Sequence, residues 1–398
     1  MILGIDASNL RVGGGITHLV ELLRAAQPQT HGFSRTIVWG AGKTLSQIDD
    51  RPWLVKAPQN LLSRALPYRV FWQRFRLARQ AKAAGCDLLF APGGSVPGDF
   101  HPVITMSRNL LPFEWRELRR YGCSWLTLKW LLLRAAQARS FARADGLIFL
   151  TRYAQHVVSK VVPLAAATTA IIPHGIGSRF LRSPREQFPL EDYSPARPFR
   201  ILYVSIVDLY KHQWHVVDAI AQLRAAGMPV LLELIGAAYP PALARLKDAQ
   251  ARVDPHGQFV HYRGAVPYGE LHRHYGNADL CLFASSCENM PNILLEAMAS
   301  GSPIACSNRG PMPEVLLDSG AYFDPENATD IARAVRELLL SPGLRARLAA
   351  GSFKRVQVYS WQRCADETFA FLATVAAVRG RGMAPQASAA TSVPRGAA

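Results

Sequence analysis

The sequence lacks long hydrophobic runs, paired cysteines and enough acidic side chains to balance its basic ones. No apolar stretch among the 398 residues reaches the ~18 to 20 residues of a membrane-spanning helix, and the opening MILGIDASNL shows no basic leader or cleavage site. We therefore expect a cytoplasmic protein. The six cysteines are scattered without a CxxC pair, which argues against a disulfide scaffold or a zinc site and predicts reduced core cysteines.

The shortage of acidic residues leaves a formal net charge of +16, which is unevenly placed. Residues 61–160 hold 16 Lys or Arg against five Asp or Glu, and within them residues 110–144 interleave Trp115, Trp125 and Trp130 with basic side chains. A basic face with aromatic anchors predicts peripheral binding to an anionic membrane surface. A solvated helix face with inward tryptophans is the alternative. Nucleic acid is not expected as a partner, because no helix-turn-helix, RNA-recognition or zinc motif accompanies the charge.

The length exceeds what one hydrophobic core usually supports, so two domains of ~150 to 200 residues are expected. Strand-like runs alternate with helical ones, which predicts parallel βαβ units. We expect an N-terminal Rossmann-like domain over residues 1–180, a linker over 181–198 and a second Rossmann-like domain over 199–362. A helix over 363–379 should pack back on the first domain, and the Gly-, Ala- and Pro-rich tail over 380–398 should be disordered.

The expected strands are short apolar runs. They span 2–6, 36–39, 87–91, 103–106, 147–150 and 170–172 in the first half, and 201–205, 230–235, 259–263, 280–284, 303–306 and 322–324 in the second.

Two glutamates, Glu288 and Glu296, bracket the segment ENMPNILLE in a stretch that otherwise has the pattern of a buried core. Glu288 follows the strand-like run DLCLFASS and therefore lies where doubly wound sheets bind ligands. Glu296 lies among apolar residues of the next helix, and since a buried glutamate needs a partner, we expect it to face a polar cleft. Asn292 shares its helix face beside the helix N-terminus, where free NH groups attract phosphate. The alternative is an exposed Glu296 on a half-buried helix.

The first strand ends in Asp6 and is followed by Gly13, Gly14 and Gly15 before the amphipathic run THLVELLRAA. Consecutive glycines let backbone NH groups approach an anion at a helix start, although a flexible turn has the same composition. The spacing is not GxGxxG, and the next strand-like run, TIVWG, ends in glycine instead of an acidic ribose ligand. A nicotinamide enzyme is therefore not expected.

Taken together, these motifs resemble the retaining glycosyltransferases of family 4. The family signature E-x7-E matches Glu288 to Glu296, and the stretches ARADGLIFLTRYAQHVV, IIPHGIGSRF and YRGAVPYGELHRHYGNADLCLFAS match in order. The resemblance extends from Met1 to about Val378. It implies an α/β protein with the GT-B fold, in which two facing Rossmann-like domains with parallel sheets enclose an interdomain cleft.

The resemblance also implies roles for residues of the second domain. Glu296 would bind the ribose hydroxyls of a nucleotide-sugar, Glu288 would contact the donor sugar, and Val266 would lie beside the base. Backbone NH groups at Asn292 and Ile293 would hold the diphosphate, which the loop of Gly13, Gly14 and Gly15 would approach from the first domain. The donor would be a UDP- or GDP-hexose, and neither a metal ion nor another cofactor is expected.

The chain departs from the family pattern at two places. The family commonly has an Arg and a Lys after the first strand of the second domain, and here Lys211 is kept but Ile206 stands at the arginine position. A His-Asp dipeptide that often follows the strand PVITM is replaced here by the run Ser107-Arg108-Asn109-Leu110, in which Asn109 is expected on the acceptor side. Our hypothesis is that Arg108 or Arg309 supplies the missing positive charge. The alternative is that Arg108 is a surface charge and Lys211 suffices.

The sequence also predicts roles for three further residues. His174 in IIPHGIG should serve the hinge between the domains and not acid–base chemistry. His18 should pack on a helix face. Glu314 should cap the helix that follows the loop SNRGPMP.

The expected function is that of a membrane-associated retaining hexosyltransferase with Glu288, Lys211 and Arg108 as catalytic residues, extending a lipid-linked acceptor for a surface glycan. One alternative is a nucleotide-sugar epimerase or phosphorylase with the same architecture. Another is a degraded transferase that only binds a nucleotide-sugar, which Ile206 and the missing His-Asp dipeptide would favour.

Overall fold

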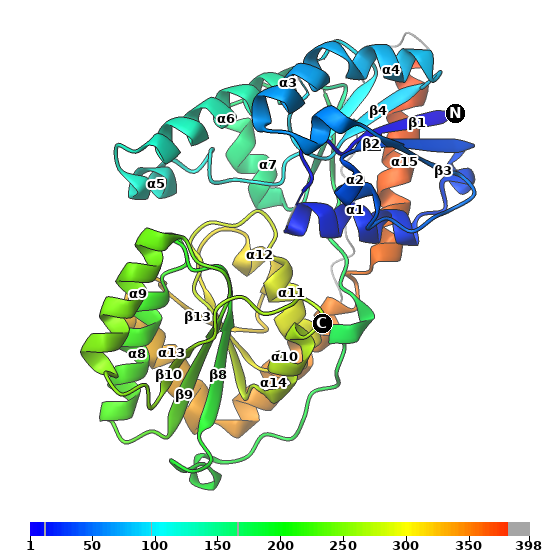
Figure 1. The fold of residues 1–398 in the computed structure, drawn as a ribbon. Coiled ribbons are helices and arrows are strands. Elements are labelled where there is room, and N and C mark those ends of the chain that lie inside the picture. The colour runs from blue at the N-terminus through cyan, green and yellow to red at the C-terminus, as the bar shows by residue number, and fades with distance from the viewer. Residues whose placement is uncertain (12, 97, 165–166, 381–398) are drawn as a thin grey trace.

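The computed structural model describes residues 1–11, 13–96, 98–164 and 167–380. They form two parallel sheets, one in the upper and one in the lower half of Figure 1, each packed with helices. This architecture confirms the predicted α/β class with two Rossmann-like halves. The predicted tail, 380–398, lies outside the described residues apart from Gly380.

The first sheet has the strand order β3-β2-β1-β4-β5-β6-β7. The strands are β1 (Ile2–Asp6), β2 (Arg35–Gly40), β3 (Leu54–Pro58), β4 (Leu88–Ala91), β5 (Val103–Met106), β6 (Gly146–Phe149) and β7 (Thr168–Ile171). The α-helices of this half are α1 (Gly14–Ala25), α2 (Gly42–Leu45), α3 (Leu66–Phe75), α4 (Leu77–Ala83), α5 (Trp115–Leu118), α6 (Trp125–Arg143) and α7 (Arg152–Ser159). Short 3₁₀ helices are η1 (Pro28–His31), η2 (Asn60–Ser63) and η3 (Arg119–Tyr121).

The second sheet has the order β10-β9-β8-β11-β12-β13. The strands are β8 (Phe199–Val204), β9 (Val230–Ile235), β10 (Val260–Tyr262), β11 (Leu280–Phe283), β12 (Ile304–Ser307) and β13 (Ala321–Phe323). The α-helices are α8 (Gln213–Ala225), α9 (Pro240–Val253), α10 (Leu271–Asn277), α11 (Asn292–Ala299), α12 (Met312–Leu316), α13 (Ala328–Leu340) and α14 (Pro342–Val356). The segment between the halves contains η4 (Ser178–Phe180) and η5 (Leu190–Asp192), and the last helix is α15 (Trp361–Gly380).

Every strand expected from the sequence is present within two residues of its predicted ends. Central strands such as β4, β5, β6 and β11 are buried along their whole length, and such strands are continuous apolar runs. The sequence analysis missed β3, which lies at the edge of the first sheet, is largely half-buried and contains Lys56 and Pro58. These residue types are typical of edge strands and weaken the strand pattern.

Both sheets have a topological switch point beside their first strand. The neighbours of β1 are β2 and β4, and the neighbours of β8 are β9 and β11, so consecutive connections diverge at these strands. α/β sheets bind ligands at the carboxyl ends of the strands beside such a point. The glycines follow β1, Lys211 follows β8 and Glu288 follows β11, so the topology places these residues at the two switch points.

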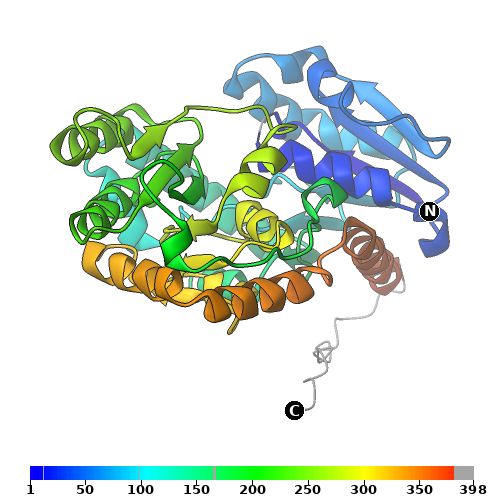
Figure 2. The same ribbon diagram turned by 90° about the horizontal axis from the view of Figure 1, so that it is seen from below.

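Two segments join the halves and lie side by side. Ile176, on the way into the second half, forms a bridge with Ser360, on the way back, and its NH donates to the Tyr359 carbonyl at 3.0 Å. Gly175 allows the close approach, because a Cβ there would lie 2.2 Å from the backbone nitrogen of Trp361. Beyond this crossing α15 packs along α1 of the first half, and Figure 2 shows α14 leading into it.

Candidate functional site

At the second switch point Lys211 and Glu288 form an ion pair. Lys211 is only 4% exposed, and its Nζ contacts Oε1 of Glu288. The ammonium also lies over the rings of Tyr210 and Phe283, 5.1 and 5.4 Å from their centroids. The Tyr203 hydroxyl donates to the Lys211 carbonyl at 2.8 Å and so fixes the backbone of this loop. A cation is therefore held at the carboxyl edge of the sheet, where it can neutralise a phosphate.

The start of α11 lies opposite the glycine loop of the first half. A Cβ built on Gly14 would lie 3.7 Å from Nδ2 of Asn292, so the two elements are close enough that a side chain at this position would contact Asn292. No side chain caps α11, and Oδ1 of Asn292 is buried without a partner. Ile293 lies half-buried in the first turn and packs against the core. An uncapped helix N-terminus offers backbone NH groups and the positive end of the helix dipole to an anion.

Arg108 contacts the same glycine loop. Its Nη1 donates to the Gly15 carbonyl at 3.1 Å and its Nη2 to the Gly14 carbonyl at 2.6 Å. Burial lowers the pKa of this guanidinium to about 10, so it remains charged at neutral pH. The side chain of Asn109 turns back instead, and its Oδ1 accepts from the NH of Leu111 at 3.1 Å.

The structure separates the two candidates for the missing positive charge. Ile206, at the position where an arginine was expected, is 47% exposed. Arg309 donates to Oδ2 of Asp324 at 2.9 Å and is occupied by that carboxylate. Arg108 contacts the glycine loop and forms no ion pair among those found in the described residues. Arg108 is therefore the better placed of the two.

Glu296 does not face a polar cleft, and that expectation was wrong. It is 1% exposed, and its Oε2 accepts a hydrogen bond from the Tyr275 hydroxyl at 3.1 Å. Burial raises the pKa of this carboxyl to about 7, although hydrogen bonds from Tyr275 and Tyr268 and the charge of Arg179 oppose the rise. The site thus contains a carboxyl group that takes up a proton close to neutral pH.

The loop between β10 and α10 covers this carboxyl. It carries Val266, which is half-buried and packs against the core, and Tyr268, whose ring lies 5.0 Å below the guanidinium of Arg179. The sequence analysis missed both tyrosines and Arg179. Their only signal was indirect, because a glutamate in a core pattern requires hydrogen-bond donors nearby.

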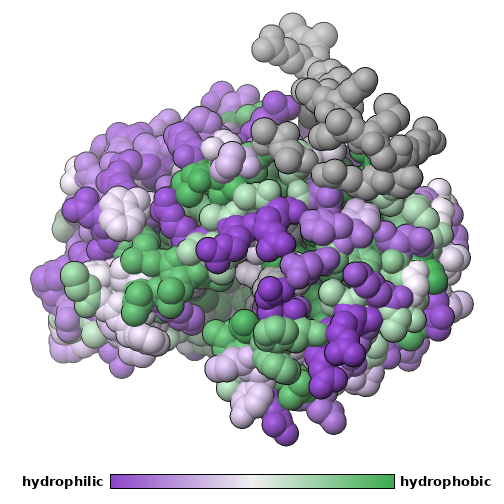
Figure 3. Space-filling view, turned by 90° about the horizontal axis from the view of Figure 1, so that it is seen from above, coloured by the Kyte–Doolittle hydropathy of each residue, from purple (hydrophilic) through white to green (hydrophobic). Residues whose placement is uncertain are grey.

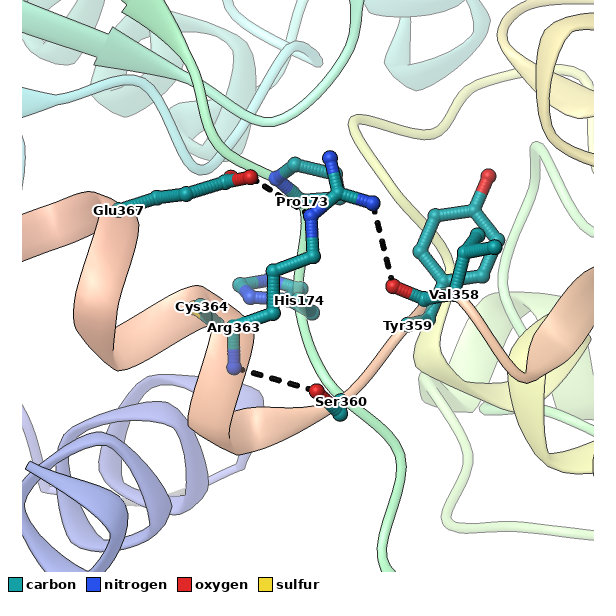
Figure 4. A pocket seen from close by; sticks show the side chains of 8 residues that line it. All are labelled: Pro173, His174, Val358, Tyr359, Ser360, Arg363, Cys364 and Glu367. Atoms are coloured by element: carbon teal, nitrogen blue, oxygen red, sulfur yellow. Dashed lines mark hydrogen bonds and ion pairs between the residues drawn. The ribbon is translucent and has the colours of Figure 1, made fainter. Parts of the chain in front are cut away.

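His174 lies where the two connecting segments cross. Its Nδ1 is 2.9 Å from Nδ1 of His18 on α1, and burial lowers the pKa of both imidazoles, that of His174 to about 3. Figure 4 shows His174 and Pro173 against the start of α15. Two neutral histidines thus join α1 to the crossing. His18 is buried as expected, and in addition it is the partner of His174.

Glu314 does not cap its own helix, and that expectation was wrong. Its two carboxylate oxygens accept from the NH groups of Arg152 and Tyr153 at 2.8 and 2.9 Å, and these residues begin α7 in the other half. A carboxylate at a helix N-terminus satisfies free NH groups and complements the helix dipole. Glu314 therefore ties the two halves together.

No helix in the described part of the chain has the length and apolar character to cross a membrane. Within the same residues no group of three or more His, Cys, Asp or Glu side chains is arranged to hold a metal ion.

Solved structures share this arrangement of two parallel sheets. Sucrose-phosphate synthase from Thermosynechococcus elongatus superposes with a TM-score of 0.70 at 19% identity, over 92% of this chain and 97% of the other. An Anabaena protein solved in complex with UDP gives 0.65 at 17% identity, over 94% and 99%. The fold is GT-B, as the resemblance implied.

Residues 186–355 match the model of the family Glycosyl transferases group 1. A GDP-mannose-dependent phosphatidylinositol dimannoside mannosyltransferase of Mycobacterium tuberculosis is 30% identical over 246 residues, which are 61% of this chain and 61% of that relative. The O-antigen chain mannosyltransferase B of Escherichia coli is 30% identical over 110 residues, 28% and 29% of the two chains. The chain thus spans less than two thirds of the length of these relatives.

The buried carboxyl of Glu296 predicts a measurable dependence of stability on pH. Its pKa is about 7 in the folded protein against 4.5 in the unfolded chain, so its contribution to stability is full below pH 4.5 and is lost as the pH rises through 7. Glu296→Gln cannot ionise. Relative to the wild type, the variant should gain about 3 kcal/mol in free energy of unfolding between pH 4.5 and pH 8, at about 1.4 kcal/mol per pKa unit.

Urea denaturation at both pH values, without nucleotide, measures this change. Glu186→Gln, at an exposed position, is the matched control and should show no such gain. Parallel pH profiles for Glu296→Gln and the wild type would contradict the prediction.

Proposed function

We propose that the protein is a retaining glycosyltransferase of family 4 that moves a mannosyl residue from GDP-mannose to a lipid-linked glycan acceptor. The names of the relatives support the donor and the sugar, and the E-x7-E signature supports the family. The observation that carries the proposal is the buried Lys211–Glu288 pair at the second switch point. It lies past the ends of β8 and β11, where such sheets bind nucleotides.

Each site residue has a role in this proposal. The diphosphate lies at the start of α11, held by NH groups of Asn292 and Ile293 and approached by the loop of Gly13, Gly14 and Gly15. Lys211 neutralises the departing phosphate, a task for fixed cations and dipoles and not for a metal ion.

The remaining contacts select the donor. Glu288 accepts hydrogen bonds from hydroxyls of the sugar, and Val266 lies beside the base. The ribose hydroxyls take the place of the Tyr268 hydroxyl on Glu296, which requires the loop that carries Tyr268 to move. His174 serves the hinge at which the halves close.

Retention of configuration follows from same-face attack. No side chain is assigned the role of a covalent nucleophile. The acceptor hydroxyl attacks from the side on which the nucleoside diphosphate leaves, the sugar–phosphate bond breaks, and the departing phosphate takes the hydroxyl proton. The product is a glycan one sugar longer with the anomeric configuration of the donor, as in the synthesis of an O-antigen or exopolysaccharide.

The test is release of nucleoside diphosphate from a panel of UDP-, GDP- and ADP-sugars, with and without extracted lipid-linked glycans. We expect GDP release from GDP-mannose, an α-linked product by NMR, and a fall in kcat of about 10² to 10³ for Glu288→Gln, because one contact that stabilises the transition state is lost. The control Glu186→Gln should be fully active.

Other outcomes identify the alternatives. Phosphate-dependent cleavage of a glycan without nucleotide indicates a phosphorylase, and a change of sugar configuration without transfer indicates an epimerase. Binding of GDP-mannose without hydrolysis or transfer indicates a degraded transferase.

Arg108 supplies the positive charge that Ile206 cannot. Its guanidinium is anchored on the carbonyls of Gly14 and Gly15, directly opposite the start of α11. Positive charge held there lies beside the expected diphosphate. Arg108→Ala should therefore lower kcat about 10²-fold. Arg108→Lys keeps the charge but loses the paired hydrogen bonds, so its kcat should lie between that of the wild type and that of Arg108→Ala.

Steady-state kinetics with GDP-mannose measures this effect, and melting temperatures report on folding. Arg309→Ala is the matched control, because Arg309 is engaged by Asp324, and it should change kcat less than threefold. Unchanged turnover in Arg108→Ala would show that Lys211 suffices.

The first half presents an apolar and basic surface that fits peripheral binding to the cytoplasmic face of a membrane. Trp125 is 77% exposed and Trp115 is also exposed, whereas Trp130 is half-buried. Further exposed apolar side chains lie on α3 and α6: Leu66, Tyr68, Val70, Phe71, Phe75, Leu128 and Leu132. Figure 3 looks from above onto the molecule and shows hydrophobic residues gathered among hydrophilic ones. Arg74 and Lys129 are exposed on the same two helices.

This surface predicts flotation with liposomes that contain anionic lipid and little flotation with neutral ones. Phe71→Ser with Phe75→Ser should reduce the bound fraction several-fold, because apolar area that enters the interface is lost. Leu340→Ser with Val358→Ser, which changes exposed apolar residues of the second half, is the matched control and should float like the wild type. Flotation that is independent of lipid charge would contradict the membrane proposal.

A further inference from the structure

One segment of the first half reaches into the loops of the second half. This clasp segment, residues 110–121, lies between β5 and α6 and contains α5 and η3. Its side chains Leu110, Leu111, Phe113 and Tyr121 share a buried cluster with residues of the second half, which are Cys287, Leu209, Tyr210 and Tyr239. The clasp segment therefore belongs to the packing of both halves.

Glu117 is the buried charge of the clasp segment. It is 4% exposed, and its Oε2 accepts from Nε of Arg120 at 2.6 Å and from the hydroxyl of Ser286 at 2.7 Å. Arg120 compensates its charge within the same segment. The hydrogen bond from Ser286 crosses to the second half.

A third residue continues this chain of hydrogen bonds. Nε2 of His212 lies 2.8 Å from the Ser286 hydroxyl, and burial lowers the pKa of His212 to about 2, so the imidazole is neutral. A carboxylate only accepts, and it is closer to Ser286 than the Tyr210 carbonyl at 3.3 Å, so the Ser286 proton points to Glu117. His212 then donates through Nε2–H, and its Nδ1 is the unprotonated nitrogen, which lies buried without a partner.

Ser286 and His212, the two members of this chain in the second half, each lie next to a residue of the proposed donor site in the sequence. Ser286 lies two residues before Glu288, and His212 follows Lys211 directly. His212 has a φ of 54°, a left-handed conformation that a residue other than glycine keeps only when its surroundings hold it. The hydrogen bond to Ser286 is one such restraint.

Other contacts of the clasp segment also reach the second half. The Tyr121 hydroxyl donates to Oδ1 of Asp208 at 2.7 Å, on the loop that carries Lys211. Arg120 and Arg116 pair with Glu326 at 2.9 and 2.6 Å. Among these contacts only the one through Glu117 and Ser286 leads to both members of the Lys211–Glu288 pair.

We infer that Glu117 is a positioning residue of the transfer reaction. Through Ser286 and His212 it fixes the two loops that carry Glu288 and Lys211, so that the first half sets the geometry of the donor site when the halves are in contact. The inference rests on the proposed function, because it assigns Glu117 to that reaction. It assigns Glu117 no contact with donor or acceptor.

The experiment compares Glu117→Ala, Ser286→Ala and the double variant in GDP-mannose turnover and in GDP affinity. Each single variant should lower kcat about 10- to 100-fold, the range expected for a hydrogen bond to a charged group. GDP affinity should change less than threefold, since no contact to GDP is removed. The double variant should be no slower than the slower single variant, because both remove the same connection. Glu117→Asp should restore part of the rate.

Arg116→Ala is the matched control. It removes an exposed contact between the same segment and Glu326, and it should change kcat less than threefold. Melting temperatures separate positioning from folding, and Ser286→Ala keeps the test valid if Glu117→Ala fails to fold.

Three outcomes would overturn the inference. They are wild-type turnover in both single variants, effects on kcat that multiply in the double variant, and a loss of stability without a loss of kcat in the folded fraction. A wild type that releases no GDP and transfers no sugar refutes the proposed function itself, and the inference falls with it. Activity of the wild type therefore distinguishes the two failures.

Discussion

A buried lysine requires a carboxylate, and much of the site follows from this requirement at Lys211. An unpaired charge removed from water costs several kcal/mol, so the loops after β8 and β11 have to meet where Lys211 and Glu288 pair. The strand order makes this meeting possible, because β8 and β11 are neighbours at the switch point. The strand order thus determines which loops meet, and the need to compensate the buried charge determines how closely they approach each other.

Glu296 is also a buried ionisable residue, but it is stabilised without a partner of opposite charge. No cation pairs with it in the described residues, and tyrosine hydroxyls donate to it instead. These hydrogen bonds only partly oppose the effect of burial, which raises the pKa of its carboxyl to about 7. Folding has already removed water from this group. A hydroxyl that replaces that of Tyr268 therefore meets an acceptor with little further desolvation, and ribose presents two such hydroxyls side by side.

The sequence predicted the features that depend on local pattern. Buried parallel strands are apolar runs and were found, whereas the edge strand β3 has no such run and was missed. Glu288 past a strand and Glu296 on a helix were also predictable, because each interrupts a regular pattern. Their partners were not. Glu314 caps a helix that begins more than 150 residues earlier, and Tyr275 donates to Glu296 from another helix, so no periodicity records either pairing.

The clasp segment connects two surfaces that sequence patterns treat as separate. Within the single turn of α5, Trp115 and Arg116 are exposed, while Glu117 is buried against Ser286 of the loop that carries Glu288. The same turn therefore combines an exposed surface with a buried contact to the second half. If the proposed lipid binding favours the position of α5 that holds Ser286, it raises the affinity for the donor. Linkage then requires that a bound donor raises the affinity for lipid by the same factor. Under the proposed function, membrane attachment and order in the donor site would therefore be thermodynamically coupled.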